Sequence, residues 1–163
     1  MAPLDDKAQM EEILRSEAVG HLAMTAEGEV YLVPLNYTYD AGRVLFHCAL
    51  QGRKLDMIRA QPKVCFEVCR QAGPPLEHQG QKCDPPFASV ICWGTARVID
   101  DLQERQEVLQ AFQARYATPE NPRTPITAES AAGCGAVAIT VTRMTGRQAK
   151  GDNDARWAWS AED

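Results

Sequence analysis

In the stretch FHCALQGRKLDMIR, residues 46–59, an apolar strand is predicted to give way to a helix directly after a glycine. The helix is predicted over residues 52–60. Arg53 and Lys54 follow Gly52 and stand at its N-terminus. The first turn of a helix has unpaired N–H groups and about half a positive charge, so each cation there costs roughly 0.3 to 1 kcal/mol. An anion bound at this turn would remove that cost, since the N–H groups and both side chains would converge on it.

A phosphate monoester fits this turn, and Gly52 lets the backbone approach it closely. The alternative is that Arg53 and Lys54 simply reach into water beside Asp56. Between residues 43 and 63 there are five basic residues and one acidic residue, a balance of +4 in a chain whose net charge is −5. The rest of the chain therefore carries −9. This acidic balance argues against general nucleic-acid binding but leaves room for a small anion at the basic stretch.

Apolar and β-branched segments on both sides of this stretch predict a mainly β protein. The predicted strands are 20–25, 30–39, 43–49, 62–68, 87–99 and 134–144. Turn clusters separate the first three, which indicates an antiparallel three-strand meander. Pro34 cannot donate to a strand ladder, so it marks an edge strand or a bulge. Six or so antiparallel strands fit a small barrel or sandwich, because closure removes exposed edges.

Two further helices are predicted from apolar residues at three- and four-residue spacing. One covers residues 4–17 behind a capping Asp5 or Asp6, and the other covers residues 100–117 behind Asp100 or Asp101. The second helix places Leu109, Phe112 and Tyr116 on one face. The sixteen residues 71–86 are predicted to form a long loop, which suggests a functional or mobile segment, and residues 145–163 a polar tail.

The length of 163 residues and the 45% hydrophobic content predict one domain, residues 1–163. The apolar runs are too short for a membrane span and the start of the chain is acidic and amphipathic, so we expect no membrane segment, no secretory signal and a cytoplasmic protein. The six cysteines form no CxxC pair, which favours reduced, mostly buried thiols. Cys65 and Cys69 would share one strand face about 13 Å apart, so no metal site is expected.

The ordered series GHLA (20–23), VPLNY (33–37), FHCALQGRK (46–54), QPKVCFEV (61–68) and SVICWGTA (89–96) resembles a known family. It is similar to the FMN-binding split barrel of the pyridoxamine 5′-phosphate oxidase type, most closely its nitroimidazole-resistance branch of nitroimidazole reductases. The similarity runs over roughly residues 10–145. The fold that it implies is mainly β, an antiparallel split β-barrel with a few flanking α-helices.

The resemblance implies FMN as the cofactor, with Arg53 and Lys54 on its phosphate and the backbone of residues 33–36 along the isoalloxazine ring. His47 and Cys48 would flank the flavin. The cofactor-binding residues are then Val33, Pro34, Leu35, Asn36, His47, Cys48, Gly52, Arg53, Lys54 and Ser89. The family also implies a homodimer with two flavins at the subunit interface, each site built from both chains.

The implied function is an FMN-dependent oxidoreductase that reduces a small nitroaromatic or related molecule, with reduced nicotinamide or another electron donor. The cofactor would carry the electron chemistry while the protein supplies anchorage and orientation. His47 is the candidate catalytic residue; alternatively it is a strand histidine with satisfied hydrogen bonds. The sequence has no alignable counterpart of the C-terminal Trp and Arg pattern of the vitamin B6 oxidases, so their substrate is not implied.

A second interpretation is a non-catalytic module of the same fold that holds flavin or haem. His47 or His21 would then be an axial haem ligand. The paired cations Arg53 and Lys54 favour a phosphate, whereas a haem site needs a histidine that faces an apolar pocket. Trp157 and Trp159 in the tail would stack on the flavin or the partner subunit, or pack on their own barrel.

Overall fold

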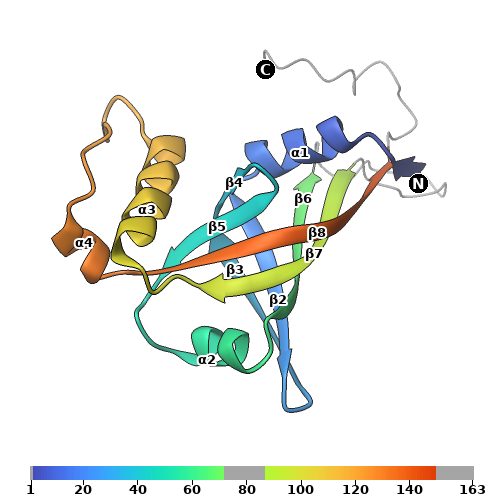
Figure 1. Cartoon of the computed structure of the whole chain (residues 1–163). Helices are drawn as coiled ribbons and strands as arrows, with labels where there is room; N and C mark the ends of the chain where they lie inside the picture. The colour runs from blue at the N-terminus through green and yellow to red at the C-terminus, as the bar shows by residue number, and fades with distance from the viewer. Residues whose placement is uncertain (1, 72–86, 150–163) are drawn as a thin grey trace, which may run out of the picture.

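One eight-stranded antiparallel sheet, curled into a half-barrel, organises the computed structural model, which describes residues 2–71 and 87–149 (Figure 1). Helices flank the sheet at its ends, so the predicted antiparallel split barrel is confirmed. Most of the predicted long loop, residues 72–86, lies outside the described residues. Trp157 and Trp159 lie outside them as well.

The strands follow one another around the half-barrel in the order β3-β2-β6-β7-β8-β5-β4, and β1 pairs with β8. The strands are β1 (Ala2–Leu4), β2 (Val19–Ala26), β3 (Glu29–Asn36), β4 (Thr38–Asp40), β5 (Arg43–Cys48), β6 (Lys63–Gln71), β7 (Phe87–Val98) and β8 (Gly135–Ala149). The helices are α1 (Lys7–Ser16), α2 (Arg53–Ala60), α3 (Leu102–Tyr116) and α4 (Ala128–Ala132). None of these helices is long and apolar enough to cross a bilayer.

The predicted three-strand meander is wrong, because the chain leaves the sheet at Tyr37 and the predicted second strand is two strands. The hairpins β2–β3 and β4–β5 both form, but the predicted strand 30–39 breaks between them, and its halves lie at opposite ends of the sheet. Tyr37 is fully buried and its hydroxyl donates to the carbonyl of Leu14 at 2.7 Å. Its backbone N–H donates to the hydroxyl of Tyr116 at 3.3 Å. These contacts hold the residue away from a strand ladder, so the chain changes edges there.

Strand β3 is an edge strand, as the proline within it predicts. Among the described strands it pairs with β2 alone, where Pro34 lies opposite His21. The missing N–H of the proline therefore leaves no gap inside the sheet. The outward-facing side chains of this hairpin include Val30 and Leu32, which are 72% and 58% exposed.

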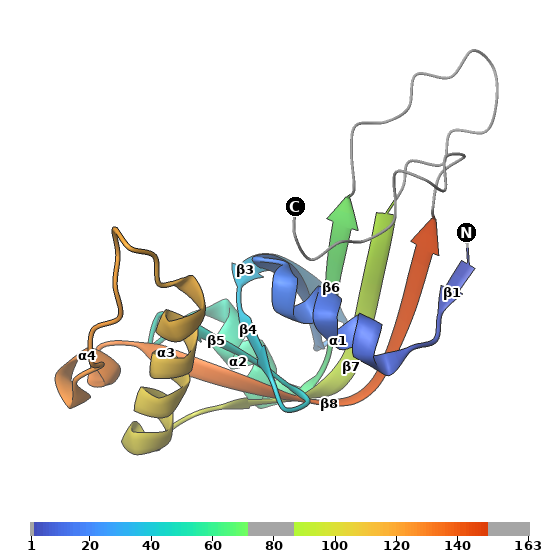
Figure 2. The same cartoon turned by 90° about the horizontal axis from the view of Figure 1, so that it is seen from above.

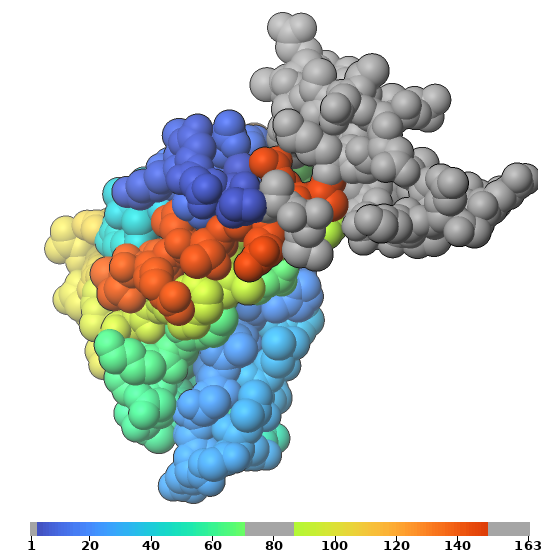
Figure 3. Space-filling model, turned by 90° about the vertical axis from the view of Figure 1, so that its right-hand side faces the viewer, coloured from blue at the N-terminus to red at the C-terminus, as the bar shows by residue number. Residues whose placement is uncertain are grey.

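The core fills the concave side of the sheet. Helix α1 buries Met10, Ile13 and Leu14 there, and α2 buries Leu55, Met57 and Ile58. Gly20 on β2 faces the fully buried ring of Phe66, which occupies the space where a Cβ at position 20 would lie. Figure 3 shows α1 (dark blue) at one end of the molecule and the β2–β3 hairpin (light blue) projecting at the opposite end.

Asp6 and Asp101 are capping residues, as predicted, but the first helix begins at Lys7 and not at residue 4, because Leu4 pairs with Gly146 in the unpredicted strand β1. The Oδ1 of Asp6 accepts from the N–H of Ala8, and the Oδ1 of Asp101 accepts from the N–H of Glu104, both at 2.8 Å. The short helix α4 was not predicted. The prediction of a tail from residue 145 is also wrong, because residues 145–149 continue β8 and pair with β7, in the long arm that Figure 2 shows beside β1.

The five cysteines within the described residues are free but less buried than the sequence predicts. Cys92 is buried, whereas Cys69 is exposed and Cys48, Cys65 and Cys134 are half-buried. Cys65 and Cys69 do share the outer face of β6, as their spacing predicts. That face carries no covering helix in the described structure, so apolar strand positions do not guarantee burial. Cys83 lies outside the described residues.

Candidate functional site

A split in the barrel lies between the two ends of the sheet. One lip is β3, whose second edge has no partner strand in the described structure. The other lip is the end of β5, since β4 pairs only with residues 43–45 and leaves the edge of residues 46–48 without a described partner. Tyr37 connects the two lips along the chain. It is the single residue between the end of β3 and Thr38, the first residue of β4, which pairs with Leu45 of β5. The predicted segments VPLNY and FHC therefore border this split, one on each side.

The N-terminus of α2 contacts both lips. Arg53 forms an ion pair with Glu29 and lies over the ring of Tyr31, with its guanidinium carbon 4.6 Å from the ring centroid, so it reaches β3. Lys54 places its Nζ 5.1 Å from the centroid of Phe46 on β5. The two predicted phosphate ligands thus extend to opposite sides of the split, with the first turn of α2 between them.

The residues of this turn fit a phosphate group. Gly52 caps α2 with φ 136°, a backbone conformation that favours glycine, and a Cβ there would meet no atom within 4 Å. The side chain of Arg53 is 50% exposed and already holds one anion, the carboxylate of Glu29. Arg53 can therefore bind an oxyanion in its present orientation, and a phosphate would compete with Glu29 for it.

The predicted flavin-flanking segment of β3 presents its side chains alternately. Val33 and Leu35 pack against the core, whereas Pro34 and Asn36 are exposed on the outer face. The Nδ2 of Asn36 donates to the carbonyl of Ala18 at 2.9 Å, which fixes the end of this strand. The part of this segment that borders the split is therefore its backbone edge, which the family resemblance implies would run along the flavin ring.

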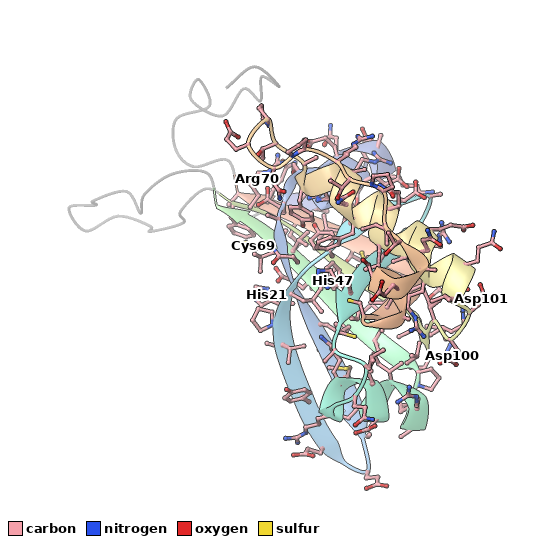
Figure 4. The ribbon with its side chains drawn as sticks, turned by 90° about the vertical axis from the view of Figure 1, so that its left-hand side faces the viewer. His21, His47, Cys69, Arg70, Asp100 and Asp101 are labelled. Carbon is pink, nitrogen blue, oxygen red and sulfur yellow. The ribbon has the colours of Figure 1, made fainter. Side chains whose placement is uncertain are left out.

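His47 lies at the end of β5, where it faces α3 and α4 rather than the core (Figure 4). Its ring meets Phe112 edge to face, with centroids 4.5 Å apart, and its Nδ1 is 3.7 Å from the Sγ of Cys134. Partial burial, together with the charge of Lys54, lowers the pKa of His47. A shift in this direction favours the neutral imidazole, and His47 stays partly exposed.

Cys48 points to the other side of the strand, against the core, where burial raises the pKa of its thiol. Ser89 lies far along the sheet from both residues. Cys48 is opposite Gly135 on β8, whereas Ser89 is opposite Arg147. Twelve residues of strand separate those two partners, about 40 Å of strand length. Within one chain, Ser89 therefore does not join the other predicted site residues.

His21, the other histidine considered for haem, lies on the outer side of the β2–β3 hairpin (Figure 4). Its Nδ1 is 3.0 Å from the Oε2 of Glu67 on the neighbouring strand β6. It is part of the outer surface of the sheet, whereas His47 faces a cavity. The structure thus separates the two histidines.

A cavity beside His47 was missed by the sequence analysis. It has a volume of about 330 Å³ and lies between α3, α4 and the end of β5. It is lined by His47, Leu109, Phe112, Gln113, Tyr116, Ala117, Asn121, Ile126, Ser130 and Cys134. The helical spacing of Leu109, Phe112 and Tyr116 predicted a shared face, but not that this face lines a cavity. The other lining residues carried no recognisable pattern.

Comparison with known proteins supports this reading of the fold. Residues 6–148 match the family model described as pyridoxamine 5′-phosphate oxidase. No match was found among curated proteins. One similar solved structure is a candidate 5-nitroimidazole antibiotic resistance protein from Bacteroides thetaiotaomicron VPI-5482. It is 20% identical, with a TM-score of 0.74 over 89% of this chain and 85% of that chain.

Two other similar structures are flavin-binding proteins. An FAD-binding protein from Mesorhizobium loti is 23% identical, with a TM-score of 0.64 over 91% of this chain and 97% of that chain. An FAD and haem binding protein from Mycobacterium smegmatis is 14% identical, with a TM-score of 0.81 over 96% of this chain and 78% of that chain. At these identities the likeness shows a shared fold.

Proposed function

Since this chain belongs to the pyridoxamine 5′-phosphate oxidase family, we propose that it is an FMN-dependent oxidoreductase that reduces a small nitroaromatic or related molecule. The observation that carries the proposal is the position of the α2 N-terminus between the two lips of the split. Arg53 and Lys54 reach opposite lips there, beside a glycine whose φ is 136°. Two cations and a helix N-terminus are a donor set suited to a phosphate monoester.

The other residues of the split are proposed to orient the flavin ring and to exchange a proton with the substrate. When bound, FMN supplies the electron-transfer chemistry, from reduced nicotinamide or another donor to the substrate. The backbone edge of residues 33–36, which has no partner strand in the described structure, would orient the ring, and Cys48, whose raised pKa keeps its thiol protonated, would flank it. His47 is the proposed catalytic residue. With Nδ1 toward Cys134, it keeps Nε2 to exchange a proton with the substrate.

We propose further that the protein is a homodimer with flavin at the interface. The exposed apolar side chains of Val30 and Leu32, on the uncovered outer face of the β2–β3 hairpin, support this assembly. Ser89 then has a role in the partner's site, since it is distant from the split of its own chain. The free cysteines suit a reducing compartment, and the cytoplasm is the proposed location.

The phosphate site is tested by the Arg53→Ala, Lys54→Ala double variant. Loss of two charge-assisted contacts is expected to weaken FMN binding by about 100-fold, about 3 kcal/mol. Fluorescence titration with FMN measures the affinity, and circular dichroism checks that the fold is retained. The matched control is the Arg59→Ala, Lys63→Ala double variant, which removes the same charge away from the first turn of α2. Equal FMN affinities in the two folded double variants would refute the phosphate site.

Haem binding is a second candidate function, because His47 faces a cavity with apolar walls. A relative of the same fold is an FAD and haem binding protein. The absorption spectrum of the purified protein separates the two functions. Flavin bands with release of FMN would support the oxidoreductase. An intense Soret band that is lost in a His47→Ala variant would support haem instead.

A further inference from the structure

The cavity beside His47 has the dimensions of a small-molecule site. Its volume of about 330 Å³ lies at the lower end of the range of roughly 300–1,000 Å³ for ligand pockets. Helix α3 forms one wall, and Ile126 and Ser130 from the segment that follows α3 also line the cavity. The guanidinium of Arg105 in α3 donates hydrogen bonds to the carbonyl of Ile99 and to the carbonyl of Ala131 in α4, and so links the two helices. The walls are therefore held together by the chain itself.

Aromatic rings dominate the inner surface of this cavity. Phe112 stands edge to face with His47, at an angle of 90°, and its centroid is 4.6 Å from that of Tyr116. Neither Phe112 nor Tyr116 is fully buried, although both are large side chains on the face that α3 turns toward the sheet. Rings in this arrangement provide surfaces on which a flat aromatic molecule packs in offset or edge-to-face geometry.

The described residues that line the cavity include no Asp, Glu, Lys or Arg. Several of their polar groups are already engaged within the protein. The hydroxyl of Tyr116 donates to the carbonyl of Tyr37 at 2.7 Å, and the Nε2 of Gln113 donates to Thr124 at 2.8 Å. A charged ligand would lose part of its hydration here without finding an ion-pair partner among the lining side chains, which is costly. A neutral ligand has no such cost.

We propose that this cavity is the substrate site and that it binds a neutral, planar aromatic molecule of one or two rings. That the bound molecule is then reduced rests on the proposed function, whereas its binding to the cavity does not require FMN. It deepens the function by excluding phosphorylated or carboxylated aromatics as good substrates. His47 is common to the cavity and the split, so a ring bound here lies beside the proposed flavin cleft.

Cys134 is the positioning residue of this site. Its Sγ lies 3.7 Å from Nδ1 of His47 and 3.5 Å from the carbonyl oxygen of Cys48. When the thiol donates to that carbonyl, its sulfur accepts from Nδ1, and Nε2 of His47 is left as a hydrogen-bond acceptor that faces a ligand N–H or O–H. Because Cys134 lines the cavity, its thiol also reports whether the cavity is filled.

Protection of Cys134 from alkylation tests the proposal. The full chain, with and without FMN, is treated with iodoacetamide in the presence of indazole, a neutral two-ring molecule that has no nitro group to reduce. Mass spectrometry of peptides gives the rate at each cysteine. At about ten times the Kd of indazole, roughly one tenth of the cavities stay open, so alkylation of Cys134 is expected to slow about tenfold. Exposed Cys69 is the internal control and should not be protected.

Matched ligands and variants sharpen the test. Indazole-3-carboxylate has the same ring with a negative charge and should give less than about twofold protection of Cys134 at the same concentration. The Phe112→Ala and Ser130→Phe variants should lose protection, the first by removing a wall and the second by filling the cavity. Glu107→Ala, on an exposed position of α3, should keep it. Circular dichroism confirms that each variant is folded.

The outcomes separate this inference from the proposed function. Protection in a protein that does not bind FMN would support the cavity and refute the flavin function. FMN binding without protection of Cys134 would leave the flavin function and refute the cavity. Equal protection by the carboxylate, or protection that survives in both cavity variants, would overturn the assignment to a neutral aromatic bound at this place.

Discussion

The two lips of the split are covered in different ways. The lip formed by the end of β5 has α3 and α4 over it, so that His47 shares a cavity with Phe112 and Tyr116. The lip formed by β3 has no described element over its outer face, where Leu32 is 58% exposed. The chain thus completes one side of its cleft by itself, while the other side has the exposed apolar character of a surface that a partner covers.

The largest effect is expected from Gly20→Ala, which disturbs the support of the β3 lip. A Cβ at this position would overlap the fully buried ring of Phe66. Overpacking of this kind is expected to lower the free energy of unfolding by about 3 kcal/mol. Denaturant titration followed by circular dichroism measures it. Gly133→Ala, where a Cβ would meet its nearest atom at 3.7 Å, is the control and should change stability by less than about 0.5 kcal/mol.

The next effect concerns the outer face of the β3 lip. Leu32→Arg places a charge on the surface that the proposed dimer buries. We expect dissociation to monomers and a fall in FMN affinity of about tenfold or more, about 1.4 kcal/mol, because each site loses its second chain. Analytical ultracentrifugation and FMN titration measure the two effects. Leu102→Arg, at a residue 41% exposed at the start of α3, should leave both unchanged. A Leu32→Arg variant that remains dimeric would place the interface elsewhere.

A smaller effect is expected where the β3 lip contacts α2. Glu29→Gln removes the carboxylate that occupies Arg53, so the guanidinium becomes free for a phosphate. Ion pairs between exposed side chains contribute only about 0 to 1 kcal/mol, so FMN affinity should rise by about threefold. Glu27→Gln, in the adjacent turn, removes the same charge and provides the comparison. A decrease in affinity for Glu29→Gln would show that the carboxylate supports the site instead of competing for it.

The smallest effect concerns the pKa of His47 on the covered lip. Burial and the charge of Lys54 should place this pKa below 6.5, and Lys54→Gln should raise it. The unfolded chain then binds more protons than the folded one between the two pKa values. The free energy of unfolding should therefore increase with pH up to about 6.5. Titration by NMR gives the pKa directly, and His47→Gln should remove its share of the slope. A pKa above 6.5 would contradict the assigned environment.

The elements of the fold could largely be read from the sequence, because each depends on local pattern. Alternating apolar residues predicted the strands, and Asp6 and Asp101 marked the helix starts. The break at Tyr37 could not be predicted, since the run VYLVPLNYTY has the composition of one strand throughout. Contacts with residues distant in sequence divide this run. The core buries the ring of Tyr37, and the residues before and after it pair with two different strands, β2 and β5.

The candidate site was predictable only in part. The GRK motif predicted the cations at the start of α2, but their partners Glu29 and Tyr31 come from a strand that the motif does not mention. The helical spacing of Phe112 and Tyr116 correctly placed them on one face. Spacing, however, does not reveal whether a face is filled by the core or lines a cavity, because this depends on the volume between elements distant in the sequence.

The single residue between β3 and β4 has a consequence for how the barrel closes as it folds. The two edges that are farthest apart across the sheet are neighbours along the chain, separated by Tyr37. Bringing them together therefore closes a very short loop and costs little chain entropy. The slow steps should instead be the pairings of β8 with β5 and of β6 with β2, which join residues far apart in sequence. Because Tyr37 is buried and hydrogen-bonded at both its hydroxyl and its N–H, the width of the cleft is set once these pairings form, before any ligand arrives.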